Sequence, residues 1–242
     1  MIDLHTHILP GLDDGARTLE DALDMASAFA DEGVTAVAAT PHVRDDYPTT
    51  AETMQRGVAA LQRVLDEAGI PLVLLPGAEI AVPWVARLDD SELRRLTLAA
   101  SGRYLLVETP YRGWPPAVVE QLRRLVVAGF TPVLAHPERN PVVQATPSLL
   151  APLVEGGLLV QVTAASLDGR LGKAAQATGR QLVAAGLAHV LASDAHAAHV
   201  RAAGMLSALD TLGDEALARW LSTDVPLALA HGQDAPPRPP SP

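Results

Sequence analysis

Residues 104–139 read YLLVETPYRGWPPAVVEQLRRLVVAGFTPVLAHPER, and this stretch holds one complete unit of the pattern that decides the fold. Two short apolar runs, Tyr104–Val107 and Thr131–Leu134, predict strands, and Pro116–Ala128 between them predicts a helix. Continuous apolar runs are typical of strands that are buried on both faces. A helix between two such strands predicts parallel pairing through a right-handed crossover.

The same alternation continues over almost the whole chain. Further strands are predicted at Ile2–Leu4, Thr35–Ala39, Leu72–Leu75, Leu158–Val162 and His189–Ala192. Further helices are predicted from an N-cap at Thr18 to just before Gly33, and at Ala51–Ala68, Pro147–Glu155 and Lys173–Ala185. Seven strands with helices outside them predict an α/β barrel, and an open doubly wound sheet is the alternative.

The composition sets limits on the class of protein. A chain of 242 residues, 48% of them hydrophobic, suits one large domain, which we predict at residues 1–232 before a Pro-rich, disordered tail at residues 233–242. The net charge of −10 disfavours nucleic-acid binding, and the lack of cysteine excludes thiolate metal sites. No apolar stretch is long enough to span a bilayer and the start is not a signal peptide, so we expect a cytoplasmic protein.

Histidines and acids follow six of the seven predicted strands. In chain order these residues are His5, His7, His42, Glu79, Glu108, His136, Asp194 and His196. Because the carboxyl ends of parallel barrel strands share one face, we expect these side chains to converge. Without metal, the neighbouring carboxylates would repel one another and shift towards protonation. The pattern therefore predicts a multinuclear metal site, to which only the sixth strand, ending near Gln161 and Thr163, contributes no such group.

The opening motif HTHILPGLDDG, residues 5–15, supplies one wall of this site. His5 and His7 are two residues apart on an extended backbone, so both imidazoles project to the same side and can reach one ion. Asp14 adds an oxygen ligand from the following loop, and Asp13 is assigned to the turn. Imidazole and carboxylate ligands without sulfur favour manganese, iron or zinc over calcium or magnesium alone.

Two arginines next to the ligand motifs point to phosphate. Three divalent ions would outweigh the four candidate carboxylates and leave a site of about +2 in an acidic protein, which attracts a dianionic phosphate. Arg139 follows His136 by three residues and Arg201 follows His196 by five. The planar guanidinium binds phosphate in a bidentate manner, so both arginines are candidate phosphate ligands.

The motifs HTH, TPH, GAE, LAHPER and SDAH, in this order, resemble the polymerase and histidinol phosphatase (PHP) superfamily. The opening HTHILPGLDDGA is similar to the CpsB/CapC family, which comprises bacterial metal-dependent protein-tyrosine phosphatases of capsule and exopolysaccharide operons. The resemblance covers the chain to about residue 230. It implies a distorted seven-stranded barrel, a PHP phosphatase domain with a trinuclear and often manganese centre, and dephosphorylation of a bacterial tyrosine kinase that regulates polysaccharide synthesis.

The resemblance also assigns roles to individual residues. It implies metal binding by His5, His7, Asp14, His42, Glu79, Glu108, His136, Asp194 and His196, and phosphate contacts by Arg139 and Arg201. The last loop departs from the family pattern because AAHVRAA carries His199 and lacks the glycine that often precedes the arginine.

The expected reaction is an in-line displacement by a metal-bridging hydroxide, with Arg139 and Arg201 stabilising the equatorial oxygens. Without cysteine the phosphocysteine route is closed, and Asp14 or His42 is a candidate proton donor.

The alternative functions are a phosphatase of histidinol phosphate or another small phosphomonoester, a nuclease, and a non-catalytic metal-binding regulator. Tyr111 and Trp114 either form an aromatic rim for the phenyl ring of a substrate or only pack within their loop. His189 is expected to have a structural role, and His231 is expected to have no role in the site.

Overall fold

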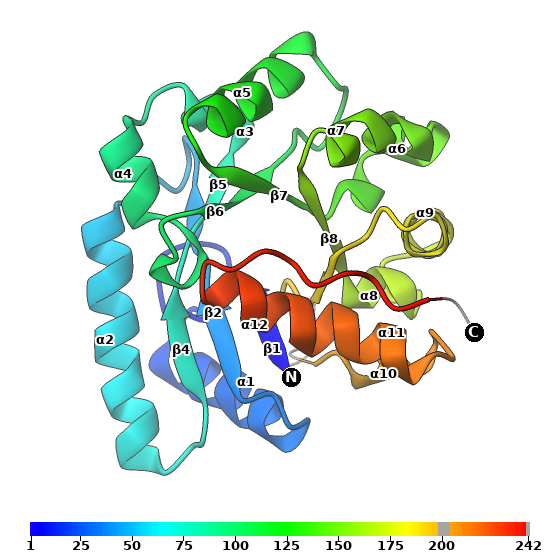
Figure 1. The fold of residues 1–242 in the computed structure, drawn as a ribbon. Coiled ribbons are helices and arrows are strands. Elements are labelled where there is room, and N and C mark those ends of the chain that lie inside the picture. Colours follow the sequence, from blue (N-terminus) through cyan, green and yellow to red (C-terminus); the bar gives the residue numbers. More distant parts are fainter. Residues whose placement is uncertain (198–203, 241–242) are drawn as a thin grey trace.

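Parallel strands occupy the centre of the molecule and helices surround them (Figure 1). The computed structural model describes residues 1–197 and 204–240. Its strands are β1 Ile2–Thr6, β2 Ala36–Ala39, β3 His42–Val43, β4 Val73–Pro76, β5 Glu79–Ala81, β6 Tyr104–Glu108, β7 Thr131–Ala135, β8 Leu159–Thr163 and β9 Val190–Ala192. One sheet has the order β1-β2-β4 and the other β3-β5-β6-β7-β8-β9, and all pairings between these strands are parallel.

All seven predicted strands are present, but within the described residues they lie in two sheets rather than one, and the sequence analysis missed β3 and β5. Only two residues separate each missed strand from the strand before it, so the chain passes from one sheet directly into the other. Runs of two or three residues give no periodic pattern from which a strand could be predicted. Their pairing matters for the site, because the register places His42 beside Glu79.

The first and last strands of the chain also lie side by side. The backbone N–H of His7 donates to the carbonyl of Ala195 at 2.9 Å, and that of Asp194 donates to the carbonyl of His5 at 3.0 Å. These hydrogen bonds bring residues far apart in the sequence to the same end of the strands.

The helices confirm most of the predicted segments. They are α1 Leu19–Asp31, α2 Ala51–Ala68, α3 Val82–Val85, α4 Asp90–Arg95, α5 Pro116–Val127, α6 Pro141–Ala145, α7 Ala151–Glu155, α8 Ala164–Leu167, α9 Lys173–Ala184, α10 Leu206–Asp210, α11 Glu215–Arg219 and α12 Val225–Ala230. Short helical turns are η1 Leu98–Ala100, η2 Pro137–Arg139, η3 Pro147–Leu150 and η4 Trp220–Asp224. Thr18 caps α1 as predicted, because its hydroxyl accepts the N–H of Asp21 at 3.1 Å. None of the helices described is both long and apolar enough to cross a membrane.

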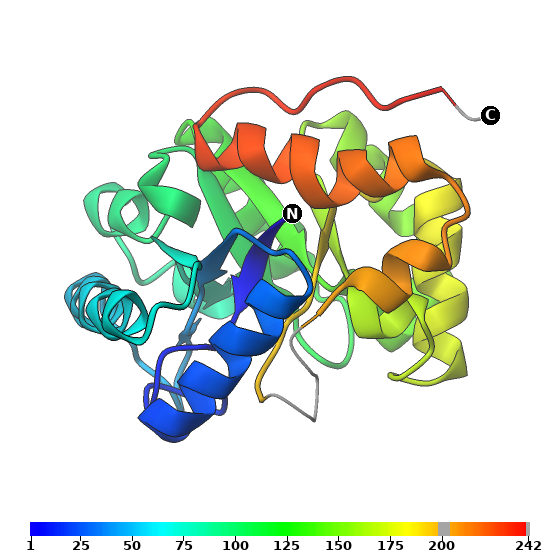
Figure 2. The same cartoon turned by 90° about the horizontal axis from the view of Figure 1, so that it is seen from below.

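The C-terminal segment was expected to be disordered, but residues 233–240 lie along the body of the molecule (Figure 2). The carbonyl of Gln233 accepts the hydroxyl of Tyr104 at 2.5 Å, and that of Pro236 accepts the indole N–H of Trp220 at 3.0 Å. Arg238 donates to the carbonyl of Val183 at 2.8 Å. A Pro-rich segment forms no regular element because it lacks N–H groups, yet its carbonyls still accept hydrogen bonds from the body.

Candidate metal centre

The nine predicted metal ligands lie together, within or after the carboxyl ends of β1, β2, β4, β6, β7 and β9. Among them, His42 and Glu79 are also the first residues of the short strands β3 and β5, and Asp14 lies in a loop. Their ligand atoms form four overlapping groups, each with atoms within 4.8 Å of one another. The groups are His7, Asp14, His42 and His196; His5, Glu79 and His136; His5, His7 and Asp194; and His42, Glu79 and Glu108. All of these residues except Asp14 are buried. The convergence that the strand-end pattern predicts is therefore present in the structure.

His5 and His7 direct their rings to the same space, with the two Nε2 atoms 3.2 Å apart. Each Nε2 lies 3.4 Å from Glu79 Oε2 and 3.4 Å from Asp194 Oδ1. A tetrahedron of ligand atoms about 2.1 Å from a central ion has edges of about 3.4 Å. The separations among His5, His7 and Asp194 therefore fit three ligands of one transition-metal ion, and Glu79 lies at the same spacing from both histidines.

Gln161 on β8 fixes the ring of His5. Its Oε1 accepts the backbone N–H of His136 at 3.2 Å, which identifies that atom as the amide oxygen. The same oxygen lies 3.0 Å from His5 Nδ1, so Nδ1 carries the proton and Nε2 presents its lone pair to the cluster. This role of Gln161 was not predicted because an amide is not a typical metal ligand, although Gln161 ends the one predicted strand without an imidazole or a carboxylate.

Asp13 performs the equivalent function for His7. It belongs to the turn, as predicted, because its Oδ1 accepts the N–H of Gly15 at 3.0 Å. Its Oδ2 also accepts His7 Nδ1–H at 2.7 Å and the backbone N–H of His42 at 3.0 Å. Assigning Asp13 to the turn alone was therefore incomplete, since this carboxylate orients one candidate ligand and anchors the backbone of another.

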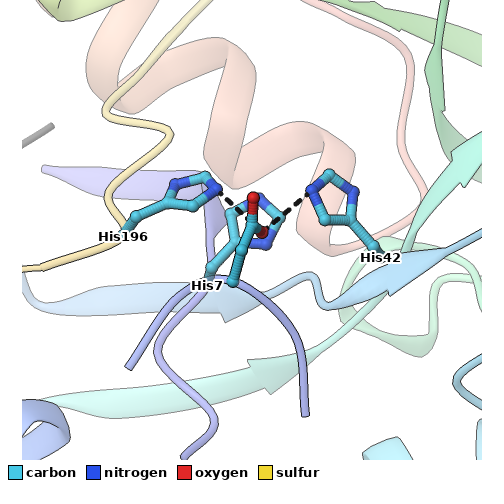
Figure 3. A group of neighbouring side chains, drawn as sticks. His7, His42 and His196 are labelled. Carbon is cyan, nitrogen blue, oxygen red and sulfur yellow. Dashed lines mark ion pairs between the residues drawn. The ribbon is translucent and has the colours of Figure 1, made fainter. Parts of the chain in front are cut away.

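Asp14 extends from the same loop towards two histidines. His42 and His196 approach the site from opposite sides of His7 (Figure 3), and their Nε2 atoms lie 3.3 and 3.4 Å from Asp14 Oδ1. The loop closes at Gly15, where a Cβ atom would lie only 2.1 Å from the carbonyl oxygen of His7. A side chain at this position would push the loop, and Asp14 with it, away from the histidines.

Glu79 connects the remaining groups. Its Oε1 lies 2.9 Å from His136 Nε2 and its Oε2 lies 2.8 Å from His42 Nδ1. Glu108 Oε1 is buried and has no hydrogen-bond partner among the described residues. A buried carboxylate oxygen without a donor is costly, and a bound cation would satisfy it. The residues present therefore fit a group of divalent ions.

Protonation of the cluster is governed by burial and by the crowding of charges. Burial opposes the charged form of His42, but Asp14 and Glu79 outweigh it and raise its pKa to about 9. Burial likewise opposes ionisation of Glu79, and His5 with the other histidines still holds its pKa well below the usual range. Burial and the adjacent charge of Glu79 raise the pKa of Glu108 to about 7. Divalent ions would replace these shared protons, because metal ligands bind in their deprotonated forms.

Two candidate ligands have left-handed backbone conformations. His136 has a φ of 32° and Asp194 a φ of 53°, and neither is a glycine. Such conformations cost about 1–3 kcal/mol each and are concentrated at functional sites. His136 directly follows β7 and Asp194 comes two residues after the end of β9, and at both positions the strained backbone turns the side chain into the cluster.

Cationic side chains lie beside the carboxylates. Arg139 on η2 donates from Nη1 to Asp194 Oδ2 at 2.6 Å, and its side chain remains 20% exposed. Arg44 was not among the predicted site residues, yet its guanidinium lies 3.6 Å from Glu108 Oε2 and 3.8 Å from Asp14 Oδ2. Its position two residues after His42, in TPHVR, was the available signal. Arg201 and His199 lie outside the described residues.

The fold and the site define an α/β protein whose parallel strands end in a histidine- and carboxylate-rich candidate metal centre. Residues 1–220 match the family model for capsular polysaccharide synthesis proteins CpsB/CapC. The chain belongs to the CpsB/CapC family.

Relatives in this family carry names that describe an activity. The chain is 39% identical over 197 residues to the tyrosine-protein phosphatase YwqE of Bacillus subtilis, covering 81% of this chain and 77% of the relative. It is 32% identical over 199 residues to the putative tyrosine-protein phosphatase CapC of Staphylococcus aureus, with the same coverage.

Solved structures agree with the family assignment. One, from work on YwqE of Bacillus subtilis and CpsB of Streptococcus pneumoniae as unique metal-dependent tyrosine phosphatases, matches with a TM-score of 0.88 and 35% identity over 100% of this chain and 99% of that chain. A probable 2-pyrone-4,6-dicarboxylic acid hydrolase of Acinetobacter baumannii shares the fold alone, with a TM-score of 0.58 and 16% identity over 96% of this chain and 98% of that chain.

Proposed function

We propose that this chain is a metal-dependent protein-tyrosine phosphatase that hydrolyses phosphotyrosine on a bacterial tyrosine kinase regulating capsule or exopolysaccharide synthesis. The observation that carries the proposal is the set of four overlapping ligand groups with Arg139 at their edge. The names of the relatives in the CpsB/CapC family support the choice of phosphotyrosine as substrate.

The proposed cofactor is three divalent metal ions, with manganese favoured and iron or zinc as alternatives. The residues that would hold them are His5, His7, Asp14, His42, Glu79, Glu108, His136, Asp194 and His196. When bound in such a site, divalent ions lower the pKa of water towards neutrality and neutralise charge on phosphoryl oxygens.

The residues of the chain supply binding and orientation for this reaction. Arg139 lies close enough to Asp194 to share the edge of the cluster, so its guanidinium can bind two phosphoryl oxygens as charge builds up on them. Arg201 is proposed as the second phosphate ligand. Asp14, which is 36% exposed, is the candidate ligand placed to exchange a proton with solvent or with the leaving tyrosine. The ordinary pKa of tyrosine, near 10, makes it a better leaving group than an alkoxide.

Three structural expectations accompany this function. We propose that the two parallel sheets are parts of one distorted seven-stranded barrel, in which β2 with β3 and β4 with β5 act as single interrupted strands and β9 adjoins β1. The hydrogen bonds between residues 5–7 and 194–195 support this arrangement. We further propose that residues 1–232 form a single domain and that the protein acts in the cytoplasm.

The test is turnover by the purified chain supplied with manganese. We expect it to release phosphate from a phosphotyrosine peptide faster than from histidinol phosphate, and to leave single-stranded DNA intact. Chelation should abolish the activity, and added manganese should restore it. Preferred hydrolysis of histidinol phosphate would favour the small-molecule alternative, and cleavage of DNA would favour a nuclease.

A further inference from the structure

A hollow of about 370 Å³ opens beside the candidate metal centre, where β6 ends. One side of it is apolar and is formed by Ala81, Pro83, Pro110 and Tyr111. Glu108 also lines the hollow, and its carboxylate belongs to the ligand group with His42 and Glu79. A substrate whose phosphate reached the metal centre could therefore extend its organic part into this hollow.

Tyr111 is the aromatic residue among those that line this hollow, and it remains 52% exposed. The guanidinium of Arg139 lies 5.9 Å from the ring centroid. Arg44 lines the same hollow. An aromatic ring that packs beside an arginine at the edge of a phosphate site is partly held in place, so less entropy is lost when a ligand packs against it.

Trp114 faces a different part of the molecule. It lines a separate groove between α5 and α7 together with Val119 and Leu153. Of the two aromatic residues in TPYRGWPP, only Tyr111 adjoins the candidate metal centre, and Trp114 provides a matched control from the same segment.

We propose that Tyr111 is a specificity-determining residue whose ring, with Pro83 and Pro110, packs against the aromatic ring of phosphotyrosine. This inference rests on the proposed phosphatase function and identifies the part of the site that selects aryl over alkyl phosphoesters. Flat apolar walls stabilise an aromatic ring through burial and offset stacking, whereas the short side chain of phosphoserine would leave the hollow unfilled. The contact raises affinity without taking part in the chemical step.

The experiment compares two non-hydrolysable ligands, phenylphosphonate and methylphosphonate, by calorimetric titration of the manganese-loaded protein. We expect the natural chain to bind phenylphosphonate about tenfold more tightly. Tyr111→Ala should remove this preference and leave the dissociation constant of methylphosphonate unchanged, which also reports that the variant is folded. Tyr111→Phe and Trp114→Ala should both keep the preference, because the first retains the ring and the second lies in the other groove.

Two results would overturn the inference: a natural chain without preference for phenylphosphonate, or a Tyr111→Ala variant that retains the preference. The outcome is separate from that of the proposed function. If the natural chain binds phenylphosphonate preferentially through Tyr111 but does not hydrolyse a phosphotyrosine peptide, the hollow is assigned correctly and the proposed reaction is wrong. If the natural chain hydrolyses the peptide and the Tyr111→Ala variant keeps the preference, the proposed reaction is correct and the role assigned to Tyr111 is wrong.

Discussion

The carboxyl and amino ends of the strands differ in how their polar groups are satisfied. At the carboxyl ends, buried histidines and carboxylates crowd together, Glu108 Oε1 lacks a hydrogen-bond partner among the described residues, and the backbone is strained at His136 and Asp194. At the amino ends, the C-terminal segment satisfies buried donors, including the hydroxyl of Tyr104 and the indole N–H of Trp220. One end is organised for chemistry at a cost in stability, and the other end stabilises the fold.

This contrast separates two kinds of substitution. Changes at the carboxyl ends should reduce activity and metal binding more than they reduce stability. Changes at the amino ends should lower the free energy of unfolding and leave catalysis unaffected.

Glu79→Gln should have the largest effect, because Glu79 contacts His136 and His42 at once. Loss of its charge should reduce kcat/KM for a phosphotyrosine peptide by roughly a thousandfold and lower the manganese content of the protein. Steady-state kinetics and elemental analysis would measure both. Glu120→Gln, the same change on the exposed face of α5, should match the natural chain. Full activity in the Glu79→Gln variant would show that Glu79 is not needed as a metal ligand.

Arg139→Lys should reduce kcat/KM by about a hundredfold, because lysine keeps the charge and loses the bidentate geometry. The inhibition constant of inorganic phosphate should rise in parallel, as a competition assay would show. Arg56→Lys on the exposed face of α2 serves as the control. An unchanged inhibition constant would mean that Arg139 only pairs with Asp194 and does not bind phosphate.

Gln161→Leu should reduce manganese affinity or activity about 10- to 100-fold, because His5 would lose the acceptor that fixes its tautomer. Gln161→Glu retains an acceptor oxygen and should lose less. Manganese titration followed by activity would compare the two variants. Equal losses in both would show that size or charge at this position matters rather than the hydrogen bond to His5.

Deletion of residues 233–242 tests the opposite end. The deletion removes the carbonyls that accept hydrogen bonds from Tyr104 and Trp220, and it removes Arg238, which donates to the carbonyl of Val183. The free energy of unfolding should therefore fall by about 2 kcal/mol. Urea denaturation would measure the change, and kcat/KM should stay constant. Loss of activity at full stability would contradict the division between the two ends.

The smallest effect is expected at His189, which precedes β9 at the amino end. Burial and the nearby charge of Arg238 lower its pKa to about 4, and its Nδ1 accepts the N–H of Val160 at 3.2 Å. The unfolded chain, with a histidine pKa near 6.5, binds the proton more readily, so stability falls as pH drops from about 6.5 to about 4.

His189→Asn keeps an acceptor oxygen and removes the titration. Between pH 8 and pH 5.5 the natural chain should lose about 1.4 kcal/mol more than this variant, as urea denaturation at both pH values would show. Parallel losses in the two proteins would assign the pH dependence to other groups.

The sequence was sufficient for the larger features of both regions. Seven apolar runs predicted the main strands, because a strand is visible as a local pattern of residues. The histidines and acids at the ends of these runs predicted that His5 and Asp194 lie close together, because parallel strands have their carboxyl ends at the same side of a sheet. That these residues bind metal stays a prediction.

The missed features depend on contacts between distant residues. The positions of Gln161 at a strand end and of Arg44 after His42 were the signals in the sequence, but only the fold shows that both side chains contact candidate ligands. The two short strands β3 and β5 are defined by pairing, of β3 with β5 and of β5 with β6, rather than by a pattern of their own. The C-terminal segment is held by hydrogen-bond donors from the rest of the protein, so its position could not be predicted from its own amino-acid composition.

The most direct test of the central claim is a manganese titration of chelator-treated protein, with phosphotyrosine-peptide hydrolysis as the readout. We predict no activity in the stripped protein and a rise that saturates at about three ions per chain, the number proposed above for the ligand cluster. Hydrolysis that survives complete removal of metal, or a chain that binds no divalent ion, would contradict it.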